Sequence, residues 1–302
     1  MSHAPDSLRA IFFALGANAA IAVAKFFAAL YTGSNAMLAE AIHSAADCGN
    51  QGLLLLGIKH AKQPPSPEYP LGFGKAVYFW SFIVALILFS MGGLFSIYEG
   101  IHKLESNEPL RAPWLAVLIL LFSIAAETVS LLGCLREVNR VRGGKTLWQW
   151  FRETRQSELL VVLGEDTAAL AGLTLALLAV LMTIVTGDPR YDAAGSIAIG
   201  VVLVLVAIGI GVEIKALLIG QSVEPEVRQA IRERLEGREE VERILNLITL
   251  QLGPDVMVAV KAQMREQGAA AEMIHDINRC EADLRAAFPA VRWLFFEPDV
   301  VD

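Results

Sequence analysis

Apolar residues form six long runs along the first 220 residues, and short polar stretches separate them. Each run reaches the roughly 20 residues that an α-helix needs to cross a bilayer. The third run, which includes FIVALILF, and the sixth, which includes IAIGVVLVLVAIGIGV, are the clearest. The pattern predicts six transmembrane helices, near residues 10–31, 35–58, 76–99, 113–135, 159–185 and 193–219.

Residues 221–302 follow a different pattern, one typical of a small folded domain. Val227, Ile231 and Leu235 recur at steps of four between Pro225 and Gly237, which predicts an amphipathic helix. The chain continues with RILNLITLQLG and VMVAVKAQM as strands around a Gly-Pro-Asp turn, AAEMIHDINRCEADLRAAF as a helix, and VRWLFFEP as a strand. The order αββαβ predicts a ferredoxin-like α+β domain, with helices on one side of a sheet.

Composition supports this division into a six-span membrane α-helical domain, residues 1–220, and an αββαβ domain, residues 221–302. The chain is 55% hydrophobic and 19% charged, with a mean hydropathy of +0.50, which is typical of a membrane protein. A net charge of −7 without a long basic run argues against nucleic acid as a partner. The three cysteines lie far apart, so neither a disulfide framework nor a thiolate zinc site is indicated. The first ten residues do not resemble a cleaved signal peptide.

The basic residues of the loops predict an orientation. Lys and Arg collect on the cytoplasmic side of membrane proteins. The loops near 59–75 and 136–156 hold nine of them, whereas the opposite loops hold only Lys103, Arg111 and Arg190. With six spans, both termini and the αββαβ domain are then cytoplasmic. The expected location is the inner or plasma membrane of a bacterial cell.

The second predicted span is the most polar, and its polar residues form a stripe. Glu40, His43, Asp47 and Asn50 are spaced by 3, 4 and 3 residues, so they share one face of a helix. Ionisable residues within a membrane span are costly and are functional-site candidates by default. An imidazole and a carboxylate one turn apart suit zinc and its transition-metal neighbours. The alternative is a buried His43–Asp47 hydrogen bond that only holds helices together.

Two ligands do not complete a tetrahedral site, so another span must contribute. The fifth span holds Glu165 and Asp166, which point about 100° apart on a helix, so only one is expected to face the second span. The other is then an outer partner, a proton site or a structural group. Glu127 in the fourth span either pairs with Lys25 or Ser123 or takes part directly in transport.

At this point the sequence resembles the cation diffusion facilitator family. The segment YTGSNAMLAEAIHSAAD resembles the signature of that family's second span, with its HxxxD motif. Lys25 before it, YPLGFGKA after it, six spans and a C-terminal αββαβ domain also fit. HSAADCGNQGLLLLGI and LGEDTAALAG resemble the branch that includes the animal mitochondrial zinc transporter.

Several positions depart from the common pattern of that family. If Asp166 is aligned with the aspartate of the usual fifth-span HxxxD, Val162 stands where the histidine would be. Gly72-Phe73-Gly74 replaces the usual Gly-His-Gly, and the loop between the fourth and fifth spans has no histidine-rich stretch. The start of the first C-terminal strand also lacks the usual histidine. Cytoplasmic metal sites are therefore expected to be depleted.

The resemblance implies that His43, Asp47 and Asp166 are the metal ligands. Glu165 is our candidate for the missing fourth ligand, with Asn50 and Glu127 behind it and Glu40 on the same stripe as a further secondary candidate. A site of three ligands and a water is the alternative.

The implied function is secondary transport: export of a divalent cation, with zinc favoured over iron, cobalt or manganese, in exchange for protons. The protein is then no enzyme and needs no catalytic cofactor. Its expected partners are the cation, protons, the lipid bilayer and a second copy of itself. The competing hypotheses are a non-transporting metal-binding scaffold or sensor, and a membrane metalloenzyme, which would use the same residues to activate water.

Overall fold

The computed structural model describes residues 4–32, 35–106, 113–265 and 269–301. Within its helices, the side chains of residues 4–7, 29, 31–32, 35–43 and 46 are also left undescribed. Gly33 and Ser34, where the sequence predicts a turn, lie outside the described residues, and so does Arg111.

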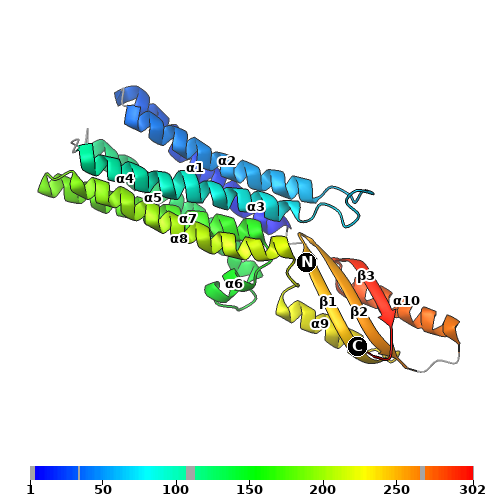
Figure 1. Ribbon diagram of the computed structural model, residues 1–302. Helices are drawn as coiled ribbons and strands as arrows, with labels where there is room; N and C mark the ends of the chain where they lie inside the picture. Colours follow the sequence, from blue (N-terminus) through cyan, green and yellow to red (C-terminus); the bar gives the residue numbers. More distant parts are fainter. Residues whose placement is uncertain (1–3, 33–34, 107–112, 266–268, 302) are drawn as a thin grey trace.

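Long helices form a bundle, and a small α+β domain lies at one end of it (Figure 1). Among the described residues, five stretches are long and apolar enough to cross a membrane, which shows a multi-pass membrane protein. The α2 helix lies in the same bundle against α1 and α3 but is not one of these five, so its crossing stays a prediction. The bundle elements are α1 (Ala4–Thr32), α2 (Asn35–Ala61), α3 (Ala76–Ile87), η1 (Leu88–Leu94), α4 (Phe95–Ser106), α5 (Pro113–Val141), α7 (Ser157–Thr186) and α8 (Arg190–Ile219).

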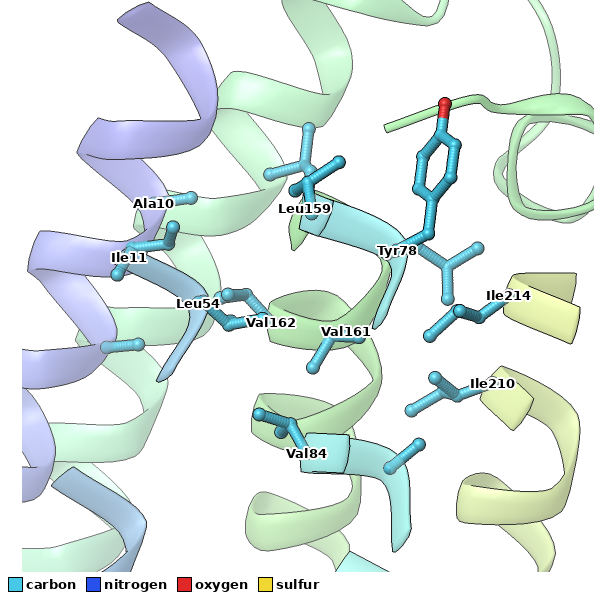
Figure 2. Close-up of a cluster of buried hydrophobic side chains, with 14 of the residues drawn as sticks. Ala10, Ile11, Leu54, Tyr78, Val84, Leu159, Val161, Val162, Ile210 and Ile214 are labelled. Atoms are coloured by element: carbon cyan, nitrogen blue, oxygen red, sulfur yellow. The ribbon is translucent and has the colours of Figure 1, made fainter. Parts of the chain in front are cut away.

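The bundle core is built from facing apolar side chains of several helices. Figure 2 shows Leu54 of α2 directed toward Val162 of α7, with Ile210 and Ile214 of α8 on the other side of α7. All four are at most 1% exposed. Lipid tails are as apolar as these side chains, so close packing rather than exclusion from water must hold the helices together.

The elements α3, η1 and α4 follow one another directly and form one long helical rod, which we call the third rod. Small residues allow the third rod to approach α8 closely. A Cβ atom added at Gly200 of α8 would come within 2.7 Å of the Gly93 carbonyl oxygen, and one added at Gly100 within 2.8 Å of the Ala193 carbonyl oxygen. Glycine is therefore required at these crossings. The sequence pattern did not predict that residues 88–94 form a π-helical segment.

A short helix that was not predicted, α6 (Leu147–Glu153), lies in the loop between α5 and α7. Thr146 caps it: its Oγ1 accepts the Gln149 amide at 3.2 Å, while Gln149 Oε1 accepts the Thr146 amide at 3.1 Å. This reciprocal capping box explains why so short a segment is helical.

The C-terminal domain contains α9 (Pro225–Glu236), β1 (Val241–Leu252), β2 (Asp255–Met264), α10 (Ala270–Ala287) and β3 (Val291–Pro298). Its sheet has the order β1-β2-β3, with β1 antiparallel to β2 and β2 parallel to β3. The helices and strands therefore follow the order that the sequence predicts; the ferredoxin-like classification stays a prediction. The side chains on one sheet face, such as Leu247, Val258 and Val260, form a core with Ile231 of α9 and Leu284 of α10.

The turn between β1 and β2 touches the membrane domain. The Gly253 amide donates to the Tyr78 hydroxyl of α3 at 3.0 Å, and the backbones of Gly253 and Gly74 are in close contact. Gly253 has a φ of +66°, a conformation that favours glycine. Next to this contact, Lys75 Nζ donates to the carbonyl oxygen of Leu218 near the end of α8 at 3.3 Å.

We predict that Tyr78→Phe loosens this contact, because the Gly253 amide loses its acceptor. A neutral hydrogen bond is worth roughly 1 kcal/mol, which corresponds to about fivefold faster amide exchange at Gly253. Hydrogen–deuterium exchange of the peptide that contains Gly253 measures this change. Tyr98→Phe is the matched control, since Tyr98 is 66% exposed and far along the same rod. Equal exchange in both variants would contradict the prediction.

Candidate functional site

The polar stripe of α2 continues into the interior of the bundle. Asn50 is 3% exposed and Gln51 is fully buried, while Asp47 is half-buried one turn earlier. The side chains of Glu40 and His43 lie outside the described residues, so the structure does not test their predicted roles.

Glu165 of α7 joins this stripe. Its two carboxylate oxygens accept hydrogen bonds from the side-chain amides of Asn50 at 3.0 Å and Gln51 at 2.8 Å. Gln51 in turn accepts a hydrogen bond from the Asn18 amide of α1 at 3.4 Å. Two neutral amides of α2 therefore hold a buried carboxylate of α7, and an amide of α1 supports one of them. Sequence reasoning missed Gln51 and Asn18, although Gln51 directly follows Asn50 in the polar run.

Asp166 points to a different helix. It is 1% exposed, and its Oδ2 accepts the Ser130 hydroxyl of α5 at 2.8 Å. Its Oδ1 is buried without a hydrogen-bond partner. The two adjacent acids thus diverge as the helical geometry predicts: Glu165 bonds with α2 and Asp166 with α5.

Glu127 lies on the same buried face of α5 as Ser123 and Ser130. It is 2% exposed, and neither its Oε2 nor the Ser123 hydroxyl has a hydrogen-bond partner. Lys25 of α1 interacts electrostatically with Glu127, and its Nζ also donates to Ser44 of α2 at 3.0 Å. The sequence suggested Lys25 or Ser123 as the structural partner of Glu127. Lys25 interacts with Glu127, whereas the Ser123 hydroxyl makes no hydrogen bond to it.

Four acids from three helices lie within electrostatic range in this region. Glu127 and Glu165 each interact with the other and with both Asp47 and Asp166. Like charges repel strongly where the dielectric constant is low, and buried oxygens without partners are costly. A cation or bound protons would offset both costs. The part of the chain with described side chains, which excludes His43, contains no group of three His, Cys, Asp or Glu residues close enough to hold a metal ion.

Val162, at the position where the resembling family has a histidine, lies in the apolar core. It is fully buried, one helical turn before Asp166, and directed toward Leu54 (Figure 2). The α2–α7 contact at this level is therefore apolar, and the polar groups begin one turn further along α7.

Comparison with known proteins decides the family. A family model described as a cation efflux transmembrane domain matches residues 11–219. The chain belongs to the cation efflux family. Members of this family are transporters rather than enzymes, so the metalloenzyme hypothesis is set aside.

Individual relatives in the cation efflux family confirm the resemblance to the branch that includes the animal mitochondrial zinc transporter. The mitochondrial proton-coupled zinc antiporter SLC30A9 of Mus musculus is 37% identical over 231 residues, which are 76% of this chain and 41% of that protein. Metal tolerance protein C4 of Arabidopsis thaliana is 29% identical over 82% of this chain and 55% of its own length. The cation-efflux pump FieF of Cronobacter sakazakii is 27% identical over 81% of this chain and 76% of its own length. The chain thus spans about two fifths of the length of the mitochondrial relatives.

We predict that Gln51→Leu destabilises the folded protein, because Glu165 Oε2 loses its donor inside the bundle. Leaving a buried acceptor unpaired costs roughly 1–3 kcal/mol. Thermal unfolding in detergent measures the loss, with Gln63→Leu at the exposed end of the same segment as control. If both variants unfolded at the wild-type temperature, the amide network would have no structural role.

Proposed function

We propose that this protein is a secondary transporter that exports a divalent metal cation from the cytoplasm, zinc in the first place, in exchange for protons. The observation that carries the proposal is the group of four acids contributed by α2, α5 and α7, of which Asp47 is half-buried and the other three are buried. Buried acids inside a membrane bundle are costly and typically mark ion or proton paths. Membership in the cation efflux family supports the same conclusion.

We propose His43, Asp47 and Asp166 as the ligands of the cation. Asp166 supports this assignment with an oxygen that is buried and unpaired. Glu165 stays the candidate fourth ligand, but both of its oxygens accept amide hydrogen bonds in this conformation, so Asn50 or Gln51 would have to move aside. Glu127 has an unpaired buried oxygen and is the secondary candidate, followed by Asn50 and Glu40.

The choice of zinc rests on two arguments. An imidazole nitrogen with carboxylate oxygens suits zinc better than calcium or magnesium, which prefer oxygen alone. The mitochondrial relatives are named as zinc antiporters. Iron, cobalt and manganese accept similar ligands and are the competing cations.

Exchange for protons follows from the ligand chemistry. A histidine must be neutral and a carboxylate ionised to bind a metal, so protons compete with the cation. A proton gradient directed into the cytoplasm would then drive the cation out. The name of the mitochondrial relatives as proton-coupled antiporters supports this coupling.

The proposed orientation places both termini and the C-terminal domain in the cytoplasm of a bacterial cell. The basic loops at 59–75 and 136–156, at the same end of the bundle as the C-terminal domain, support it. The proposed assembly is a homodimer. The sheet face opposite the core carries Ile248, Ala259 and Phe295 in register across the three strands, and Ile248 and Phe295 are each 55% exposed. An exposed apolar face of this kind suits a symmetric partner.

We predict that zinc flux into proteoliposomes under an imposed pH gradient is lost in Asp47→Asn and in Asp166→Asn. Each substitution removes a charged ligand but keeps the side-chain size. A zinc-sensitive dye inside the liposomes measures the flux. Asp188→Asn is the matched control, since Asp188 lies in the turn before α8 and its carboxylate accepts the Arg190 amide. Wild-type flux in either site variant would contradict the ligand assignment.

We also predict that the direction of the pH gradient decides whether zinc accumulates. Zinc collects in the compartment that supplies the protons, because protons that bind to the site from that side displace zinc into that compartment. Collapsing the gradient with a protonophore should reduce uptake to the level of passive equilibration. Flux that ignores the gradient would leave metal transport intact but refute proton exchange.

A non-transporting metal-binding scaffold is the second candidate function. The apolar Val162 and the amide-bonded Glu165 favour it, since both reduce the ligands available in α7. Zinc that binds but does not move, in liposomes of either pH gradient, would favour this function over transport.

A further inference from the structure

The short helix α6 carries two tryptophans with opposite surroundings. Trp150 is 2% exposed and belongs to the core of the bundle, whereas Trp148 is 70% exposed and Leu147 is 42% exposed. The Trp148 ring stacks on Phe151, with ring centroids 5.8 Å apart and planes 6° from parallel. Trp150 thus fastens the helix to the bundle, and Trp148 and Leu147 face away from it.

The helix lies beside the bundle, at the level of the membrane spans. Arg152 of α6 is ion-paired with Glu213 of α8, and Glu213 lies six residues before the end of that span at Ile219. At 1.5 Å per residue this is about 9 Å inside the end of α8. Figure 1 agrees, since α6 lies alongside the bundle and short of the sheet. The α6 helix therefore lies beside the last turns of α8.

Exposed arginines occur on α6 and near the end of α5, the helix that precedes it. Arg136 and Arg140 are one turn apart near the end of α5, and both are exposed. The side chains of Arg140 and Arg152 are each more than half exposed, although Glu137 and Glu213 pair with them. Long basic side chains at a span end extend toward phosphates, and basic residues near a membrane surface attract anionic lipids.

We propose that α6 is an interfacial membrane anchor. Trp148 and Leu147 lie in the headgroup layer of the leaflet nearest the C-terminal domain, and Arg136, Arg140 and Arg152 bind anionic lipid phosphates there. Tryptophan favours this layer because its ring has an apolar body and one polar N–H. The anchor fixes the start of α7, the helix that carries Glu165 and Asp166. The proposal depends on the membrane location and not on the transported ion.

Two single-tryptophan variants test the proposal. The chain has five tryptophans, so replacing four by phenylalanine leaves either Trp148 or Trp150 as the only emitter. Both are studied in nanodiscs of phosphatidylcholine, with and without phosphatidylglycerol, in which one lipid is brominated near the top of its acyl chains. We expect brominated lipid to quench Trp148 several-fold more than Trp150, and brominated phosphatidylglycerol to quench Trp148 more than brominated phosphatidylcholine at equal content. Arg136→Gln with Arg140→Gln should remove that lipid preference.

Other outcomes overturn the proposal. Quenching of Trp148 by aqueous iodide, but not by brominated lipid, would place the face in water. Quenching by neither agent would mean that protein covers it, such as a second copy of the chain. Equal quenching by both lipids in the parent protein would refute the arginine contribution. If the four replacements prevent folding, the difference in quenching between the wild type and Trp148→Phe gives the same comparison.

Discussion

The burial of negative charge among apolar helices is the constraint on which the rest of this structure depends. Glu127, Glu165 and Asp166 are at most 5% exposed in a bundle whose other contacts are largely apolar. Such groups persist only where donors or counter-ions compensate them. The chain meets this requirement unevenly. Two amides satisfy Glu165 and one hydroxyl half-satisfies Asp166, while Glu127 has Lys25 within electrostatic range and an unpaired oxygen.

This uneven compensation makes the region suited to binding a cation or proton. A fully satisfied network would be a rigid structural element. Here α2 and α7 are joined by amide hydrogen bonds, whereas the acid oxygens toward α5 are incompletely paired. A cation or proton would gain the most binding free energy at these unpaired oxygens. The third rod, which lies against α8 through glycines, also contacts the β1–β2 turn, so a change in the bundle would reach the C-terminal domain through Tyr78 and Gly253.

Much of the architecture follows from the sequence, because apolar runs and alternation report burial directly. Val227, Ile231 and Leu235 predicted α9, and the Gly253 turn was correctly placed between two strands. The polar stripe also pointed to the right face of α2, since Asn50 does contact the fifth span at Glu165.

Other features could not be predicted from the sequence, for identifiable reasons. The α7 helix is apolar on most of its surface, so its pattern does not fix its rotation, and only the structure shows which acid faces which helix. Gln51 is uncharged, so it did not stand out as the partner of a buried acid. The α6 helix is too short for periodicity to detect, and its capping box is a weak signal in isolation.

Zinc K-edge X-ray absorption of the purified, zinc-loaded protein tests the central claim most directly. The account predicts a shell of nitrogen and oxygen ligands near 2.0–2.1 Å, with an imidazole contribution that His43→Ala removes and a coordination that Asp166→Asn alters but Asp188→Asn does not. A spectrum that is identical in the wild type, His43→Ala and Asp166→Asn would contradict the claim that the buried acids of the bundle hold the cation.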